Sequence, residues 1–117
     1  MTSTTAPSFI TTHVLDSAVG APAAGVAVLL EARDREGWTE VAAGTTGADG
    51  RIGALGPAAL PSGIYRLTFA VGDYYAARGT TTFYPEVSIV VRIDSEQSHY
   101  HVPLLLSPFA YSTYRGS

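Results

Sequence analysis

The sequence predicts an all-β domain, a two-sheet and mostly antiparallel β-sandwich of about eight strands with one short helix. Two observations predict it. Hydrophobic and polar residues alternate along several short stretches, which is the period of a half-buried strand. Turn residues separate these stretches at intervals suited to a sandwich. Of the 117 residues, 46% are hydrophobic and 15% are charged, a balance that supports one core and excludes a disordered chain.

The elements follow one another in a simple order. Residues 1–8, rich in Ser, Thr, Ala and Pro, are expected to form a flexible tail before a single domain over residues 9–117. In TTGADG, which ends at Gly50, the Asp-Gly pair favours a tight hairpin turn. DYYAARG can hold two helical turns, with Asp73 as N-cap and Gly79 as the stop. The expected strands cover residues 9–15, 25–32, 38–44, 51–55, 64–71, 82–93 (entered after Pro85), 99–107 and 111–117.

Composition excludes several classes of protein. The formal charge is −3 and the seven basic residues are spread along the chain, so no patch suited to nucleic acid is visible. The absence of cysteine excludes disulfides, thiolate catalysis and Cys-ligated metal. No apolar run approaches the ~20 residues that span a bilayer, and the N-terminus does not resemble a signal peptide. We therefore expect a cytoplasmic protein that does not bind membranes.

Three histidines are the first candidates for chemistry, and all lie in predicted strands. His99 and His101 project to one face of their strand because successive side chains alternate. His13 lies in the first strand. They could be partly buried residues with satisfied hydrogen bonds, ligands of a three-histidine zinc site with an open position for water, or metal-free acid–base groups.

Arg51 and the segment YSTYRGS are further candidates. Arg51, directly after the Asp-Gly turn, is either a solvated strand-edge residue or a guanidinium that binds a developing anion. Tyr111, Tyr114, Arg115 and Ser117 crowd into seven residues, as a frayed edge strand or as part of a site. No G-x-S-x-G elbow, P-loop or dinucleotide fingerprint is present.

Several motifs together carry a family resemblance: ITTHVLD, PAAGVAVLLE, GADGRI, TFYPEV and HYHVPLLLSPFAYSTYRGS. From about residue 9 to the last residue, the chain resembles the transthyretin-like 5-hydroxyisourate hydrolases of urate breakdown. The resemblance implies a transthyretin-like (prealbumin-like) sandwich and a homotetramer with substrate sites at subunit interfaces. It also implies a cyclic amide hydrolase that needs no cofactor or metal. The reaction converts 5-hydroxyisourate to 2-oxo-4-hydroxy-4-carboxy-5-ureidoimidazoline, on the route to allantoin.

The resemblance also implies roles for individual residues. It assigns catalytic roles to His13, Arg51, His101 and Ser117. His13 and Arg51 would bind substrate together with Tyr114, while His99 and Arg115 would support the site. His101 is the expected base, and Arg51 would stabilise the anion formed when water attacks. The alternative functions are a transthyretin-like small-molecule binding protein, a zinc hydrolase using His13, His99 and His101, and a purely structural sandwich.

Overall fold

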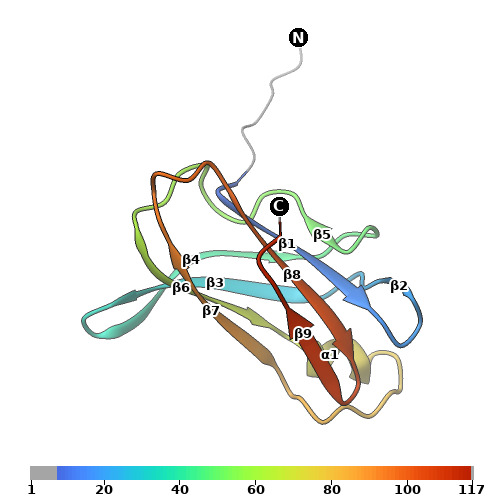
Figure 1. Ribbon diagram of the computed structural model, residues 1–117. Helices are drawn as coiled ribbons and strands as arrows, with labels where there is room; N and C mark the ends of the chain where they lie inside the picture. The colour runs from blue at the N-terminus through green and yellow to red at the C-terminus, as the bar shows by residue number, and fades with distance from the viewer. Residues whose placement is uncertain (1–7, 117) are drawn as a thin grey trace.

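The computed structural model describes residues 8–116, which form two β-sheets packed face to face (Figure 1). The first sheet has the order β2-β1-β8-β9, with β5 also paired to β1. Its strands are β1 (Ile10–Asp16), β2 (Ala21–Pro22), β5 (Arg51–Ile52), β8 (Tyr100–Ser107) and β9 (Ala110–Thr113). The second sheet consists, in order, of β4 (Gly37–Thr45), β3 (Ala27–Asp34), β6 (Gly63–Phe69) and β7 (Val87–Ile93). The predicted sandwich is confirmed.

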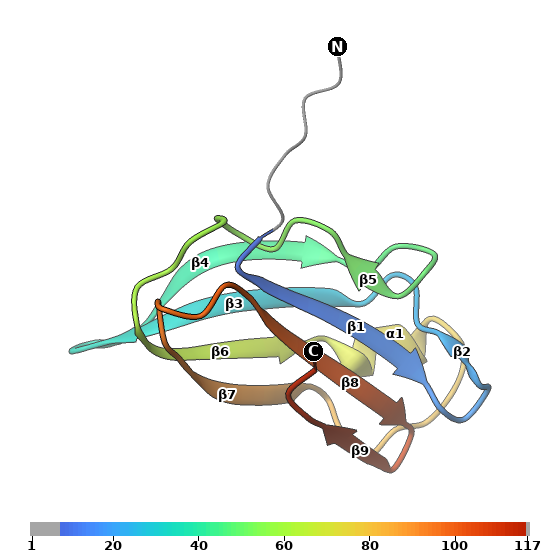
Figure 2. The ribbon, with the colours of Figure 1, turned by 45° about the horizontal axis from the view of Figure 1, so that its top comes forward.

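The described residues contain nine strands rather than about eight, because the two-residue β2 pairs with the end of β1. The predicted turn before Arg51 also forms. Gly50 has φ +77°, and the Asp49 carboxylate accepts a hydrogen bond from the Arg51 backbone N–H at 3.0 Å. The hairpin expectation is wrong, however, because β4 and β5 belong to different sheets and β5 pairs with β1 (Figure 2). Crossing between sheets allows Ile52 to be buried in the core.

The strands β1 and β8 form a parallel pair in the middle of the first sheet, from Ile10 opposite Tyr100 to Asp16 opposite Leu106. In β1 the even-numbered residues are buried and the odd-numbered ones are partly exposed. In β8 the even-numbered residues 100–106 are likewise buried. Since side chains alternate along a strand, the odd-numbered residues of both strands share the outward face of the sheet.

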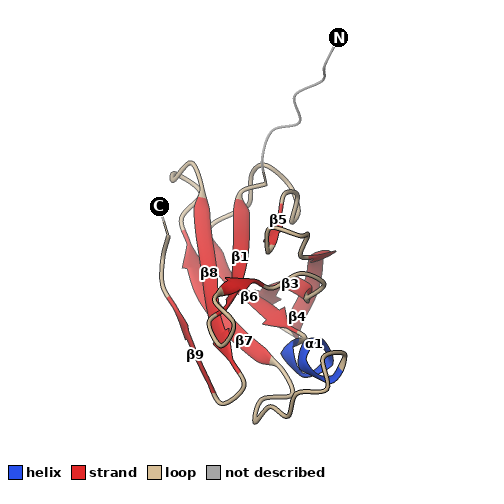
Figure 3. Cartoon of the chain, turned by 90° about the vertical axis from the view of Figure 1, so that its right-hand side faces the viewer, coloured by secondary structure: helices blue, strands red, loops and turns tan. Residues whose placement is uncertain are grey.

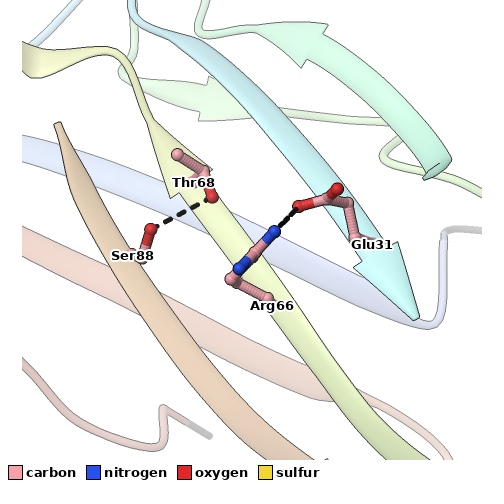
Figure 4. A network of polar contacts seen from close by, with 4 residues as sticks. All are labelled: Glu31, Arg66, Thr68 and Ser88. Carbon is pink, nitrogen blue, oxygen red and sulfur yellow. Dashed lines mark hydrogen bonds and ion pairs between the residues drawn. The ribbon is translucent and has the colours of Figure 1, made fainter. Parts of the chain in front are cut away.

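The core lies between the two sheets. Leu30 and Leu67 from the second sheet and Leu104 from the first are fully buried, and burial of such side chains is the main source of stability. The outer face of the second sheet is polar: Arg66 pairs with Glu31 at 2.7 Å, and Thr68 lies 3.2 Å from Ser88 (Figure 4). The Arg66–Glu31 pair is partly buried, with side-chain exposures of 29% and 14%.

The single helix of the described residues, α1 (Val71–Ala76), lies at one end of the sandwich (Figure 3). Its N-cap is Ala70, without a side-chain cap, so the prediction of Asp73 as N-cap is wrong: Asp73 lies in the first turn. Gly79 has φ +65° beyond the helix end, as a stop requires. The Tyr74 hydroxyl donates to the buried Asp16 carboxylate at 2.9 Å and so attaches α1 to β1. No helix of residues 8–116 is long and apolar enough to span a membrane.

Candidate active site

Three of the predicted catalytic residues meet on the outward face of the first sheet. His13 in β1 lies opposite Arg51 in the antiparallel pair of β1 and β5. His101 in β8 lies opposite Thr11 in the parallel pair of β1 and β8, two residues before His13. Both histidines are half-buried and Arg51 is exposed. Segments distant in the sequence thus bring two imidazoles and a guanidinium to one surface.

The environment of His101 favours its neutral form. Burial lowers the pKa of His101 below the ordinary 6.5, and the nearby charges of Arg51, His99 and His13 lower it further. A hydrogen bond with the backbone of Thr11 partly opposes this lowering of the pKa. A neutral imidazole at neutral pH can accept a proton, which is the requirement for a general base.

A residue that sequence reasoning missed, Thr11, joins two of the histidines. Its Oγ1 lies 3.0 Å from Nε2 of His99 and 2.8 Å from Nδ1 of His101. The alternation of side chains along β1 places Thr11 on the same face as His13. This alternation was the only feature of the sequence that could have identified Thr11 as a site residue. The parallel register with β8 was still needed to place Thr11 between the two rings.

Two glycines pack against the imidazole rings and leave room for them. A Cβ at Gly50 would lie 3.1 Å from Cδ2 of His13 and only 2.4 Å from the Val14 carbonyl oxygen. A Cβ at Gly116 would lie 2.6 Å from Cδ2 of His101. At Gly116 the backbone therefore approaches the His101 ring more closely than a residue with a side chain would allow, whereas at Gly50 the main clash would be with the Val14 carbonyl oxygen.

The other predicted residues near the C-terminus lie elsewhere or outside the described region. The Gly116 N–H donates to the His101 carbonyl oxygen at 2.8 Å, so this segment reaches His101. Arg115, however, stacks over the ring of the inward-facing Tyr100 at 4.6 Å. Tyr114 is 60% exposed and, with Arg115, lines an apolar groove of about 310 Å³ beside β7. Ser117 lies outside the described residues.

Another predicted tyrosine, Tyr111, also lies apart from the imidazoles. Its ring packs edge-on against Tyr84 with the ring centroids 5.1 Å apart. One copy of the chain therefore brings His13, His99, His101 and Arg51 together, but not the tyrosines.

The histidines are not arranged as zinc ligands. Across residues 8–116, no three His, Cys, Asp or Glu side chains are grouped so that they could hold a metal ion. Nε2 of His99 and Nδ1 of His101 are each hydrogen-bonded to Thr11 instead. The zinc interpretation thus finds no support in the geometry of these residues.

Comparison with known proteins places this chain in a family. The model of the HIUase/Transthyretin family matches residues 10–116. The chain belongs to this family. It is 47% identical over 112 residues to the 5-hydroxyisourate hydrolase of Salmonella dublin, covering 94% of this chain and 82% of that protein.

Solved structures of the HIUase/Transthyretin family share the fold of this chain. The 5-hydroxyisourate hydrolase of Klebsiella pneumoniae superposes with a TM-score of 0.82 at 37% identity, over 92% of this chain and 98% of that one. Transthyretin from Sparus aurata superposes with a TM-score of 0.88 at 34% identity, over 92% and 96% of the two chains. Since enzyme and transthyretin match the fold about equally, the site residues must distinguish the functions.

Proposed function

We propose that this chain is a 5-hydroxyisourate hydrolase of urate degradation, which adds water to the substrate and opens its six-membered ring without a cofactor. The observation that carries the proposal is the cluster of His13, Arg51 and His101 on one sheet face. The identity of 47% to a named 5-hydroxyisourate hydrolase supports it. The product is 2-oxo-4-hydroxy-4-carboxy-5-ureidoimidazoline.

The proposed mechanism gives each residue of the cluster one task. His101, held neutral by burial and by the nearby charge of Arg51, takes a proton from the attacking water and returns it to the ring nitrogen that departs when the C–N bond breaks. His13 orients that water and the substrate from the neighbouring strand. Arg51 binds the ring oxygens and stabilises the negative charge that develops on the carbonyl oxygen when water attacks the carbonyl carbon. Positioned proton transfer is worth about 10²–10⁴-fold, and loss of one donor to an oxyanion costs roughly 3–4 kcal/mol.

We further propose that the active assembly is a homotetramer in which a second copy completes each site. The cluster lies on an outward sheet face, and Tyr114, the proposed substrate-binding tyrosine, lines a groove beside β7 in the same chain. A neighbouring copy would cover the face and supply Tyr114, with Arg115 in a supporting role. Ser117 follows Gly116, whose N–H bonds to His101 within the same chain, so we assign Ser117 to the site of its own chain. Sedimentation analysis tests the assembly: a monomer that retains full activity would contradict it.

A transthyretin-like binding protein is the second candidate function. The superposition on transthyretin, with a TM-score of 0.88 against 0.82 for the hydrolase structure, favours it. Against it, the histidines and Arg51 place a proton acceptor and a cation together, as hydrolysis requires and as binding of an apolar ligand does not.

The deciding experiment generates 5-hydroxyisourate from urate with urate oxidase and follows its ultraviolet absorbance. The purified chain is added with and without a metal chelator. We expect rapid decay that survives chelation. Decay abolished by the chelator would replace the metal-free mechanism with a zinc hydrolase. Decay no faster than the spontaneous reaction would reject the hydrolase and leave the binding protein.

A further inference from the structure

The hydroxyl of Thr11 lies between two imidazoles, and neither proton transfer by His101 nor anion binding by Arg51 uses it directly. The parallel register sets Thr11 opposite His101, and His99 precedes β8 by one residue. Thr11 Oγ1 contacts His101 Nδ1 at 2.8 Å and His99 Nε2 at 3.0 Å. Both distances are within hydrogen-bonding range.

Only one of these two hydrogen bonds can use the hydroxyl hydrogen. A threonine hydroxyl donates once and accepts through its lone pairs, whereas a neutral imidazole has one N–H and one acceptor nitrogen. If Thr11 donates to one ring nitrogen, the other ring nitrogen must carry hydrogen and donate to Oγ1. The proton positions on His99 and His101 are therefore coupled through the hydroxyl.

We propose that Thr11 is a positioning residue that accepts a hydrogen bond from Nδ1–H of His101, donates to Nε2 of His99, and thereby presents Nε2 of His101 as the free base nitrogen. In this arrangement Nε2 of His101 can take up and release a proton while both hydrogen bonds of Thr11 persist. In the reverse arrangement Nδ1 of His101 is an acceptor and Nε2 already carries hydrogen, so the ring could accept a proton only by breaking the chain of hydrogen bonds.

The groups around His101 favour its neutral form, which the proposed arrangement requires. His13 and Arg51 face it from β1 and β5, His99 faces it from the segment before β8, and all three disfavour a positive charge on the ring. A neutral ring with a defined tautomer is therefore the resting state, and Thr11 defines the tautomer. Tautomers of catalytic histidines are commonly set by the partner of the other ring nitrogen. The role of the free nitrogen in hydrolysis rests on the function proposed above, whereas the proton coupling does not.

The coupling can be tested without substrate by nuclear magnetic resonance of the full chain labelled with ¹⁵N-histidine. Long-range ¹H–¹⁵N correlations distinguish the two neutral tautomers, and His99→Phe assists assignment. We expect Nδ1–H on His101 in the native chain and in Thr11→Ser, but a mixture of tautomers in Thr11→Val. A His101 tautomer that is the same in Thr11→Val as in the native chain would overturn the proposal.

Kinetics then test whether the coupling serves the reaction. Fixing the tautomer of His101 should contribute a smaller rate enhancement than the ~10²–10⁴-fold that proton transfer itself contributes. We therefore expect Thr11→Val to lower kcat/KM about tenfold. Thr11→Ser should stay within about threefold of the native value, because it retains the hydroxyl. Equal losses in both variants would overturn the proposal, since the threonine methyl group and not the hydroxyl would then matter.

A double-mutant cycle gives an independent readout that a merely structural role would not produce. If Thr11 and His99 act as one unit, His99→Phe should lower kcat/KM about as much as Thr11→Val does. The double variant should then lower kcat/KM no more than either single variant. Losses of kcat/KM that multiply in the double variant would contradict the coupling. If Thr11→Val does not fold, the about tenfold loss expected for His99→Phe tests the coupling by itself. A native chain with the expected tautomer but no hydrolysis would reject the proposed function and keep the coupling.

Discussion

Replacement of Gly116 by alanine should damage the site without damaging the fold. The added Cβ would lie 2.6 Å from Cδ2 of His101 and 3.2 Å from both Cβ and Cγ of the same residue. Rotation of the imidazole cannot relieve all three contacts. Gly116 has no positive φ, so alanine introduces no backbone strain there. The effect of the substitution is therefore confined to the contact with His101.

The size of the effect follows from these distances. The Cβ must move by about 0.8 Å to reach an ordinary van der Waals separation, and misplacement of about 1 Å can cost roughly 100-fold in rate. Either the ring shifts away from Thr11 or the segment at Gly116 loses its hydrogen bond to the His101 carbonyl oxygen. We therefore expect kcat/KM to fall about 10- to 100-fold. Loss of one hydrogen bond should lower the free energy of unfolding by only about 1 kcal/mol.

The assay is the decay of enzymatically generated 5-hydroxyisourate, combined with urea unfolding. Gly63→Ala is the matched control, because Gly63 has no positive φ and the nearest atom to its added Cβ is 3.9 Å away. The control should keep native activity. Activity of Gly116→Ala within twofold of the native chain would refute the reasoning, as would an equal loss in Gly63→Ala.

Three further predictions concern the proposed site and the attachment of α1. His101→Asn and Arg51→Gln should each lower turnover at least ~100-fold without unfolding the chain; turnover within tenfold of native would contradict these roles. In the proposed mechanism the neutral His101 ring takes the proton, so kcat/KM should fall as the pH drops through the pKa of His101, which lies below 6.5. Arg51→Gln removes a charge that lowers the pKa of His101, so the acid limb of the pH profile should move to higher pH in this variant. Arg51→Lys keeps the charge and should leave the acid limb in place. An unmoved acid limb in Arg51→Gln would reject the electrostatic role of Arg51. Tyr74→Phe should lower the free energy of unfolding by about 1–3 kcal/mol, because the buried Asp16 carboxylate loses a hydrogen-bond donor. The variant should leave kcat/KM unchanged. Native stability in urea would show that this hydrogen bond contributes nothing.

The attachment of α1 shows where local sequence patterns were insufficient. Asp73 has the side chain of an N-cap, but the helix begins earlier at Val71, after Ala70. Burial of Val71 and of the two tyrosines Tyr74 and Tyr75 positions this helix. Burial together with the Asp16 carboxylate also raises the pKa of Tyr75 to about 12, so its phenol remains protonated. Tertiary contacts outweighed the weak preference of one residue for a cap.

The site was predicted in part for a similar reason. The sequence motifs identified His13, Arg51 and His101, and strand alternation predicted that His99 and His101 share a face. Thr11 was missed, because nothing within β1 shows that His101, ninety positions later in the chain, would lie opposite it at a hydrogen-bonding distance of 2.8 Å. Within one copy of the chain, Arg115 stacks over the ring of Tyr100 on the inward face, and its supporting role stays a prediction.

The sequence alone therefore determined the sandwich class and the approximate positions of the main strands. These depend on alternation and turn residues, which are properties of neighbours along the chain. Only the tertiary structure decided that β1 lies parallel to β8, that β5 joins β1 instead of β4, and that Gly116 packs on His101. Those pairings depend on how the buried faces of two sheets fit across a common core, and that fit involves residues far apart in the sequence.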